Sequence, residues 1–248
     1  INAWSCANRV CLGQLKVTDK SNEIPAVPEL LKLLYIKGAI VTLDAMGAQE
    51  DTVKQIREAG ADYVITLKGN QGALHETVKD SFILHDKGSQ VIPVYRADAK
   101  VNADHGRIEE RFIEVMSTGK LKGLIDERWV DLNSIARITY IRTEPTGEII
   151  TEKRHLITSL AADHPTRILQ AARAHWHVEN TLHWSLDVTF GEDDCRIRDE
   201  NAAVNFSWLR KFALSLLKNE SSFKASIRRK QRKICTNISY LAKVIAQI

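Results

Sequence analysis

The sequence contains no long apolar run: no stretch of its 248 residues approaches the ~18 consecutive apolar residues of a membrane-spanning helix. It also opens without a secretory signal pattern. Its four cysteines form no C-x-x-C pair, which gives no indication of a zinc knuckle or a disulfide framework. Together these absences argue against a membrane protein and favour a protein of the reducing cytoplasm.

The composition is that of an ordinary soluble globular protein, with 44% apolar and 27% charged residues. The length suits one large domain, or one domain that carries an insertion. The net charge of +4 is unevenly distributed, because the sequence from Arg210 onward contains many basic residues and a single acidic one, Glu220. Such a basic tail suits a polyanion, although a solvated helix face would have the same composition.

Helical and strand-like patterns alternate in the first third of the chain. Residues 1–17 resemble two short strands joined by a turn, and a helix follows from Glu23, with both of its prolines expected at its start. Residues 38–47 and 61–70 are short apolar runs typical of strands buried on both faces. A helix over 48–59 separates these two runs and another, about 72–84, follows them, so the pattern predicts an α/β sheet with crossover connections.

The middle of the chain changes character at about residue 88. Residues 88–158 predict mainly antiparallel β-structure, with a turn at 145–147 and a short helix near Trp129. Helices resume after Asp163, a candidate cap. Beyond an acidic stretch, another helix is expected to turn its apolar side inward; that side comprises Phe206, Leu209, Phe212, Ala213, Leu216 and Leu217.

Residues 173–187, RAHWHVENTLHWSLD, form a helix by pattern and carry a carboxylate in an unexpected place. On a wheel of ~100° per residue, Glu179 lies inside the apolar stripe with Leu182 and Leu186. An unpaired carboxylate there would cost several kcal/mol, so it needs a cation, a metal ion or a proton. Either a structural salt bridge or a metal-binding catalytic Glu satisfies this need. The same wheel places Trp176 in the core and Trp184 against the β-rich block.

Asp44 is the second carboxylate of interest. It closes a predicted buried strand, and ligands gather at the carboxyl ends of strands in open α/β sheets. A turn or cap residue before Gly47 is the commoner role of such an Asp. If Asp44 and Glu179 converge, their oxygens could hold two divalent ions, and hard ligands of this kind select Mg²⁺ or Mn²⁺.

A different metal site could be built from the histidines. His175, Glu179 and His183 stand at four-residue steps, a spacing that could bind Zn²⁺, but the H-E-x-x-H pattern of zinc proteases is absent. Magnesium is therefore the preferred metal. In the segment DHGRIEER, Arg107 and Arg111 could contact phosphates.

Several motifs together resemble one family. The runs KSNEIPAVPELLKLL, IKGAIVTLDAMGAQ, DYVITLKGNQGALHE, HGRIEER and RAHWHVENTLHWSLDVTFGED resemble, in order, the H-repeat-associated, ISAs-type insertion-sequence transposases. These are similar to the DDE transposase superfamily, whose ribonuclease-H-like fold uses Asp, Asp and Glu to bind two Mg²⁺ ions for DNA cleavage and joining. The resemblance implies that Asp44 is the second Asp and Glu179 the Glu.

The resemblance also suggests how the chain is organised. It implies a mixed-sheet core over 1–87, a β-rich insertion over 88–158, core helices with the catalytic Glu over 159–218, and a basic helical tail over 219–248. The implied partners are DNA and a second copy in a homodimer, with no membrane. The residues expected to contact DNA are Arg107, Arg173, His175, His183, Arg196, Arg198, Arg228, Arg229 and Lys230.

The sequence departs from the family pattern in two ways. A wider group carries a Tyr-Arg-Glu-Lys signature, whereas the matching positions here are Ala172, His175, Glu179 and Leu186, so only the Glu agrees. The first Asp, expected in an Asp-Gly-Lys context on the first core strand, is absent between Ile1 and Asp44. We therefore expect a transposase that lacks its amino-terminal part and this strand. A non-catalytic DNA-binding remnant is the main alternative, and a zinc-dependent hydrolase a weaker one.

Overall fold

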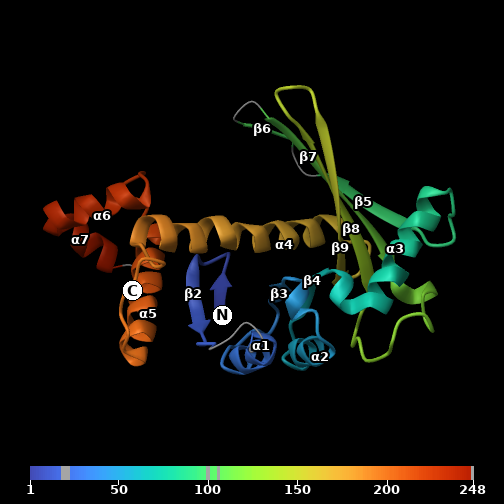
Figure 1. Cartoon of the computed structure of the whole chain (residues 1–248), viewed down its shortest axis with the longest axis horizontal. Helices are drawn as coiled ribbons and strands as arrows, with labels where there is room; N and C mark the ends of the chain where they lie inside the picture. Colours follow the sequence, from blue (N-terminus) through green and yellow to red (C-terminus); the bar gives the residue numbers. More distant parts are fainter. Residues whose placement is uncertain (18–22, 99–100, 105–106, 247–248) are drawn as a thin grey trace. The chain divides into compact units, whose positions relative to one another are not determined.

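The computed structural model describes residues 1–17, 23–98, 101–104 and 107–246; the side chains of residues 102–104, 107, 177, 179 and 180 lie outside this description. The chain forms two compact units, one of residues Val27–Arg173 and one of residues Ile1–Ala26 with Ala174–Ile248. Each unit is described by itself below, and Figure 1 labels the elements of both.

A seven-stranded mixed sheet forms the frame of the unit Val27–Arg173. Its strand order is β3-β4-β9-β8-β7-β5, and β6 pairs with β7. Only β3 and β4 are parallel; the other neighbours are antiparallel. The strands are β3 (Ile40–Leu43), β4 (Asp62–Leu67), β5 (Val94–Asp98), β6 (Asn102–Asp104), β7 (Arg107–Ser117), β8 (Ser134–Thr143) and β9 (Ile149–Thr158). The predicted α/β class is thereby confirmed.

Helices cover both faces of this sheet. One core contains side chains from α1 (Glu23–Lys32), α2 (Glu50–Glu58) and α3 (Gly72–Asp86), and the other contains side chains from α4 (Pro165–Val178). The periodicity of α2 explains its docking, since Val53 and Ile56 are both fully buried. Gly60, with φ of 73°, turns the chain into β4. Pro28 lies inside α1, not at its start as predicted.

Strand β3 differs from its prediction. It was expected to be buried on both faces, but all four of its residues are half-buried and it ends the strand order of the sheet. An edge strand has a neighbour on one side only, which a short apolar run cannot reveal. By contrast β4, which lies between β3 and β9, is mostly buried as predicted.

The β-rich block of residues 88–158 continues the same sheet, because β9 pairs with β4. Strands β7, β8 and β9 extend well past the end of β4 (Figure 1). The predicted turn between β8 and β9 is present, with Gly147 at φ of 85°. The short helix lies at Thr118–Lys120 instead of near Trp129, whose side chain is buried.

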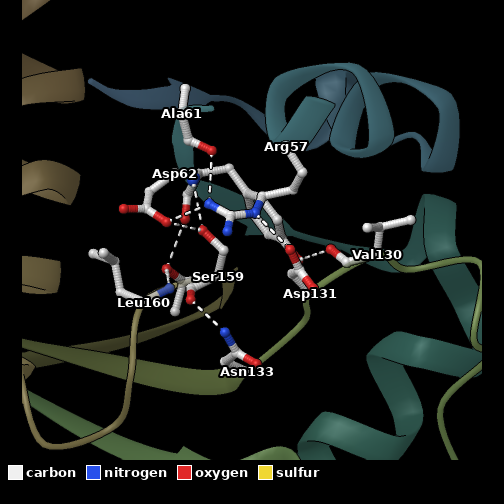
Figure 2. A network of polar contacts seen from close by, with 10 residues as sticks. Arg57, Ala61, Asp62, Val130, Asp131, Asn133, Ser159 and Leu160 are labelled. Carbon is white, nitrogen blue, oxygen red and sulfur yellow. Dashed lines mark hydrogen bonds and ion pairs between the residues drawn. The ribbon is translucent and has the colours of Figure 1, made fainter. Parts of the chain in front are cut away.

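A polar network braces the amino-terminal end of β4 (Figure 2). The guanidinium of Arg57, on α2, donates to Asp62 at 2.5 Å and to Asp131 at 2.9 Å. The hydroxyl of Ser159, which follows β9, donates to Asp62 at 2.9 Å and accepts the N–H of Tyr63 at 3.0 Å. These contacts join α2, β4 and β9 at the end of the sheet away from the carboxyl end of β4.

The other unit combines a hairpin with helices. Strands β1 (Asn2–Ser5) and β2 (Val10–Gln14) pair in antiparallel fashion, as predicted. Two π-helical segments, Glu179–His183 and Ser185–Thr189, continue the chain after α4. The helices α5 (Glu200–Asn219), α6 (Ile227–Thr236) and α7 (Ile238–Ile245) follow. Within the described part of the chain, no helix is long and apolar enough to cross a membrane.

The predicted inward side of α5 is only partly buried: Leu217 is 3% exposed, as predicted, whereas the amino-terminal part of that side faces solvent, contrary to the prediction. Phe206, Leu209 and Phe212 are 45%, 59% and 46% exposed. Lys211 and Leu214, on another side of the helix, are buried. Periodicity identifies an apolar stripe, but it does not determine which side of a helix its neighbours cover.

Candidate active site

Asp44 stands at the carboxyl end of β3, where the sequence places it. Its Oδ1 accepts the backbone N–H groups of Met46 at 3.1 Å and of Gly47 at 3.2 Å, and so caps the short 3₁₀-helix Ala45–Gly47. Among the described residues, both hydrogen bonds of this carboxylate go to Oδ1, and Oδ2 accepts none. The residue is exposed. It therefore fills the predicted capping role and keeps one oxygen for a ligand.

The loop after β4 supports the loop that carries Asp44. The amide of Asn70 donates to the carbonyl of Ala45, and that of Gln71 donates to the carbonyl of Ala48, each at 2.7 Å. Gly47 is required for close packing, since a Cβ there would lie 2.8 Å from the Cβ of Leu43. Because β3 and β4 are parallel, their carboxyl ends meet at one edge of the sheet and position this loop pair.

Glu179 begins the π-helical segment Glu179–His183, directly after α4. Its side chain lies outside the described part of the structure. A π-helix closes hydrogen bonds between residues i and i+5, so it turns less per residue than the α-helical wheel assumes, and such segments are frequent at functional sites. Leu182 and Leu186 are nevertheless buried, at 0% and 1% exposure. The predicted apolar side is thus present although the helix type differs.

The two predicted metal ligands belong to different units: Asp44 to Val27–Arg173 and Glu179 to the other. Asp44 is an exposed carboxylate with one oxygen that accepts no hydrogen bond among the described residues. Such an oxygen is a suitable ligand for a hard divalent cation. Among the described residues, no three His, Cys, Asp or Glu side chains gather closely enough to hold a metal ion. Asp44 as a metal ligand therefore remains a prediction, and so do its partners.

The predicted DNA contacts differ in how accessible they are. Arg228 and Arg229 on α6 are exposed, as are Arg196 and Arg198, whereas Arg173, His175 and His183 are half-buried. The side chain of Arg107 is not among those described.

Lys230 is at odds with its predicted role as a DNA contact, because it is 6% exposed. Its ammonium donates to the carbonyls of Leu217, at 2.8 Å, and of Glu220. The carboxylate of Glu220, which lies 3.8 Å from it, also accepts the hydroxyl of Tyr240 at 2.7 Å. Lys230 therefore joins α6 to the end of α5 and is not presented to a phosphate.

The tryptophans also differ from their prediction. Trp176, expected in the core, is 55% exposed, and Trp184 is 58% exposed.

A cluster not predicted from the sequence surrounds Tyr140 on β8. The guanidinium carbons of Arg111 and Arg154 lie 5.7 and 5.2 Å from the centre of its ring. Only the strand pairing brings these three residues together, so the sequence carried little signal for it.

Comparison with known proteins identifies similar sequences over nearly the whole chain. A family model described as "Transposase DDE domain" matches residues 6–216. The "Putative protein YbfL" of Escherichia coli K12 is 41% identical over 99% of this chain and 65% of its own length. The "H repeat-associated putative transposase YhhI" of the same strain is 40% identical over the same shares. This match confirms the resemblance to H-repeat-associated transposases that the motifs indicate.

A solved structure, a piggyBac transposase synaptic complex with hairpin DNA, gives a TM-score of 0.44 at 12% identity, over 96% of this chain and 44% of that one. This likeness is weak. The chain itself spans about 65% of the length of the curated relatives named above.

Proposed function

Because the chain belongs to the family of transposase DDE domains, we propose that it forms part of an insertion-sequence transposase. The proposed activity is metal-dependent cleavage and joining of DNA strands by phosphoryl transfer. One observation carries the proposal: within the matched range, Asp44 presents an open carboxylate oxygen at the carboxyl end of a parallel strand. This is the edge at which ligands of open α/β sheets gather.

In this proposal Asp44 and Glu179 are the ligands contributed by this chain. Oxygen ligands of this kind favour Mg²⁺ or Mn²⁺, and such ions stabilise the charge on the attacking and leaving oxygens of a phosphodiester. The two N–H groups that bind Oδ1 of Asp44 restrain the carboxylate, and among the described residues they leave Oδ2 without a hydrogen bond. The remaining metal ligands are also part of the proposal. So is the division of the chain into a core over 1–87, a β-rich insertion over 88–158, core helices over 159–218 and a basic tail over 219–248.

The proposed partner is DNA. Residues 221–248 contain seven basic residues and no acidic one, namely Lys224, Arg228, Arg229, Lys230, Arg232, Lys233 and Lys243. Of these, Arg228, Arg229 and Arg232 lie on α6 and are exposed. Their charge suits the phosphate backbone and carries no information about DNA sequence. We place the protein in the cytoplasm, where its four free cysteines would stay reduced.

The same arginines favour a second candidate function, binding to DNA without cleavage. Both functions predict affinity that falls steeply as salt rises. Only the first predicts strand breaks that require a divalent ion. Zinc-dependent hydrolysis is not supported, since the family match assigns the chain to the DDE transposases.

The test is the nicking of DNA that carries the element's ends by this protein, with Mg²⁺ or Mn²⁺ and with a chelator. We expect metal-dependent nicking that Glu179→Gln abolishes. Nicking that persists in this variant would show that Glu179 is not a ligand. Salt-sensitive binding without nicking would favour the non-catalytic function.

A further inference from the structure

Two exposed tryptophans stand on either side of Glu179 in the chain. Trp176, near the end of α4, is 55% exposed, and Trp184, between the two π-helical segments, is 58% exposed. Each directly follows a histidine, in the pairs His175–Trp176 and His183–Trp184. Because tryptophan has one of the largest apolar surfaces of any side chain, two exposed ones on one short segment indicate a surface that binds a partner.

The π-helical turn brings the two tryptophans to the same side of the helix. The eight steps from Trp176 to Trp184 would place them about 80° apart around an α-helix. The segment Glu179–His183 turns less per residue, by roughly 80°, which reduces this separation to within about 30°. The same geometry places Leu182 and Leu186 on the opposite side, in agreement with their exposures of 0% and 1%. The tryptophans therefore share the side of the helix that faces away from this core.

The residues beside the tryptophans favour a nucleic acid over an apolar protein surface. The sequence neighbours of the two rings are all polar, namely His175, His177, His183 and Ser185. Between residues 174 and 186 the sequence contains a single acidic residue, the proposed metal ligand Glu179. Imidazole N–H groups can donate to phosphate oxygens, and aromatic rings stack on bases of any sequence. A DNA strand is therefore the partner that matches both the rings and the charge.

The rings can stack only on bases whose faces are free. In a duplex each base is covered by its neighbours, so a tryptophan reaches a base face only where the strand is unpaired or a base is turned out. The Cα atoms of Trp176 and Trp184 lie roughly 10–12 Å apart along the helix axis. One base enclosed by both rings would need them about 7 Å apart, twice the ~3.4 Å spacing of stacked bases. Each ring would therefore take a base of its own.

We propose that Trp176 and Trp184 stack on unpaired bases of one DNA strand and hold a locally opened duplex beside Glu179. This inference rests on the proposed function for its partner, DNA, and adds the form of DNA that the site binds. Glu179 stands about one helical turn from each tryptophan, so a strand held by both rings passes the proposed metal ligand. Opening the duplex there gives the metal ligand access to a phosphodiester of a single strand.

Fluorescence anisotropy in EDTA tests this binding without metal-dependent cleavage. The probes are two labelled duplexes of one sequence, one fully paired and one with a short bubble of mismatched pairs. We expect the wild type to prefer the bubble. Trp176→Ala or Trp184→Ala should lower the affinity for the bubble about 5- to 100-fold and leave the affinity for the paired duplex unchanged. Trp176→Phe and Trp184→Phe should retain most of the preference, because a phenyl ring still stacks. Phe206→Ala is the matched control, an aromatic side chain that is 45% exposed on α5.

A fluorescent base reports the stacking itself. 2-Aminopurine, whose emission falls when an aromatic ring stacks on it, is placed in turn at each position of the bubble. At saturating protein, its emission at one position at least should be lower with the wild type than with Trp176→Ala or Trp184→Ala, and unaffected by Phe206→Ala. A purely structural role of the tryptophans would not produce this difference. Circular dichroism checks that each variant is folded.

The outcomes separate this proposal from the proposed function. It is overturned if the wild type binds both duplexes equally or binds neither, or if Trp176→Ala and Trp184→Ala keep the preference for the bubble. Metal-dependent nicking by the wild type would then still support the proposed activity. A preference for the bubble that depends on both tryptophans, without nicking, would instead refute the proposed activity and support the stacking.

Discussion

At the scale of single residues, Asp44 combines two roles that compete in most proteins. One oxygen of its carboxylate binds the backbone of the 3₁₀-helix and the other remains open. The two roles can be separated by substitution, because Asn retains a capping oxygen but loses the charge that attracts a cation. Asp44→Asn is therefore a sharper probe of metal binding than Asp44→Ala, which removes the cap as well.

Arg137 holds two carboxylates in place within the sheet unit. Its guanidinium donates to both oxygens of Asp86 at 2.7 Å and to Glu114 at 2.8 Å, and lies 4.7 Å from the ring centre of Phe82. Glu114 is 2% exposed, and Arg137→Met would leave its buried charge with Arg96 alone, which donates to Oε1 at 2.6 Å from a side chain that is 62% exposed. We expect a loss of roughly 3 kcal/mol in the free energy of unfolding, measured by urea denaturation.

Arg128→Met is the control for this substitution. The Arg128 side chain is 70% exposed and pairs with Glu50 and Asp126, so its loss should leave the free energy of unfolding almost unchanged. Adding Glu114→Gln to Arg137→Met should recover part of the stability, because the buried charge is then gone. Equal losses of unfolding free energy for Arg137→Met and Arg128→Met would show that the buried ion pair stabilises the fold no more than the exposed one.

His155 predicts how stability depends on pH. Burial, followed by the charges of His75 and Arg137, lowers the pKa of His155 from 6.5 to about 4. The unfolded chain therefore binds more protons than the folded chain between these values, and stability falls as the pH drops from about 6.5 to 4. The loss from this residue is at most about 3 kcal/mol.

Denaturation curves at pH 7.5, 5.5 and 4.5 measure this dependence. His155→Gln should show a shallower fall in the free energy of unfolding over this range than the wild type. His164→Gln serves as the control, since His164 has a well-exposed side chain and should leave the slope unchanged. A wild-type slope in His155→Gln would mean that other groups account for the acid sensitivity.

At the scale of elements, local patterns predict more than long-range ones. The inward residues of α2, the buried strand β4 and the capping position of Asp44 follow from short-range periodicity and turn chemistry. The edge position of β3 depends on which strands pair, and the exposure of Phe206, Leu209 and Phe212 depends on what covers α5. Neither can be deduced from one segment alone.

In the candidate site, too, local features could be predicted from the sequence and long-range ones could not. Asp44 could be found from the sequence because it closes a strand, and Glu179 because it interrupts an apolar stripe. The change to a π-helix at Glu179 left no clear pattern in the sequence. The burial of Lys230 depends on the packing of α6 against α5 and α7, which a run of basic residues does not reveal.

Helix α6 separates a structural lysine from its exposed arginines. Lys230→Met removes the bonds to the carbonyls of Leu217 and Glu220 and leaves the buried carboxylate of Glu220 without its nearby cation. We expect it to lower the free energy of unfolding by about 2 kcal/mol, measured by urea denaturation. Its effect on DNA affinity, measured where the protein is folded, should be small. A large loss of affinity in a fully folded Lys230→Met would contradict this assignment.

Arg228 and Arg229 should show the opposite behaviour. Both are exposed on α6, so Arg228→Gln and Arg229→Gln should leave the unfolding curve almost unchanged. Each should weaken binding to duplexes of any sequence and reduce the salt slope of the binding constant by about 1, as measured by fluorescence anisotropy. An unchanged slope in the double variant would remove α6 from the proposed DNA surface.

At the scale of the whole molecule, the two units carry different parts of the proposed activity. The sheet unit contributes Asp44, and the other unit contributes Glu179 and the exposed arginines of α6. The account therefore predicts that cleavage and DNA binding can be lost separately. A change at Asp44 should lower the rate of cleavage and leave DNA binding intact, whereas Arg228→Gln and Arg229→Gln should weaken binding.

The most direct test of the central claim is the rate of Mn²⁺-dependent nicking by the protein that carries Asp44→Asn. Asp51→Asn, an exposed carboxylate on α2 of the same unit, is the control. We predict that Asp44→Asn lowers the rate by orders of magnitude with an unchanged unfolding curve, because the cap is kept and the ligand charge is lost. Asp51→Asn should nick at the wild-type rate. Wild-type nicking by Asp44→Asn would contradict the account.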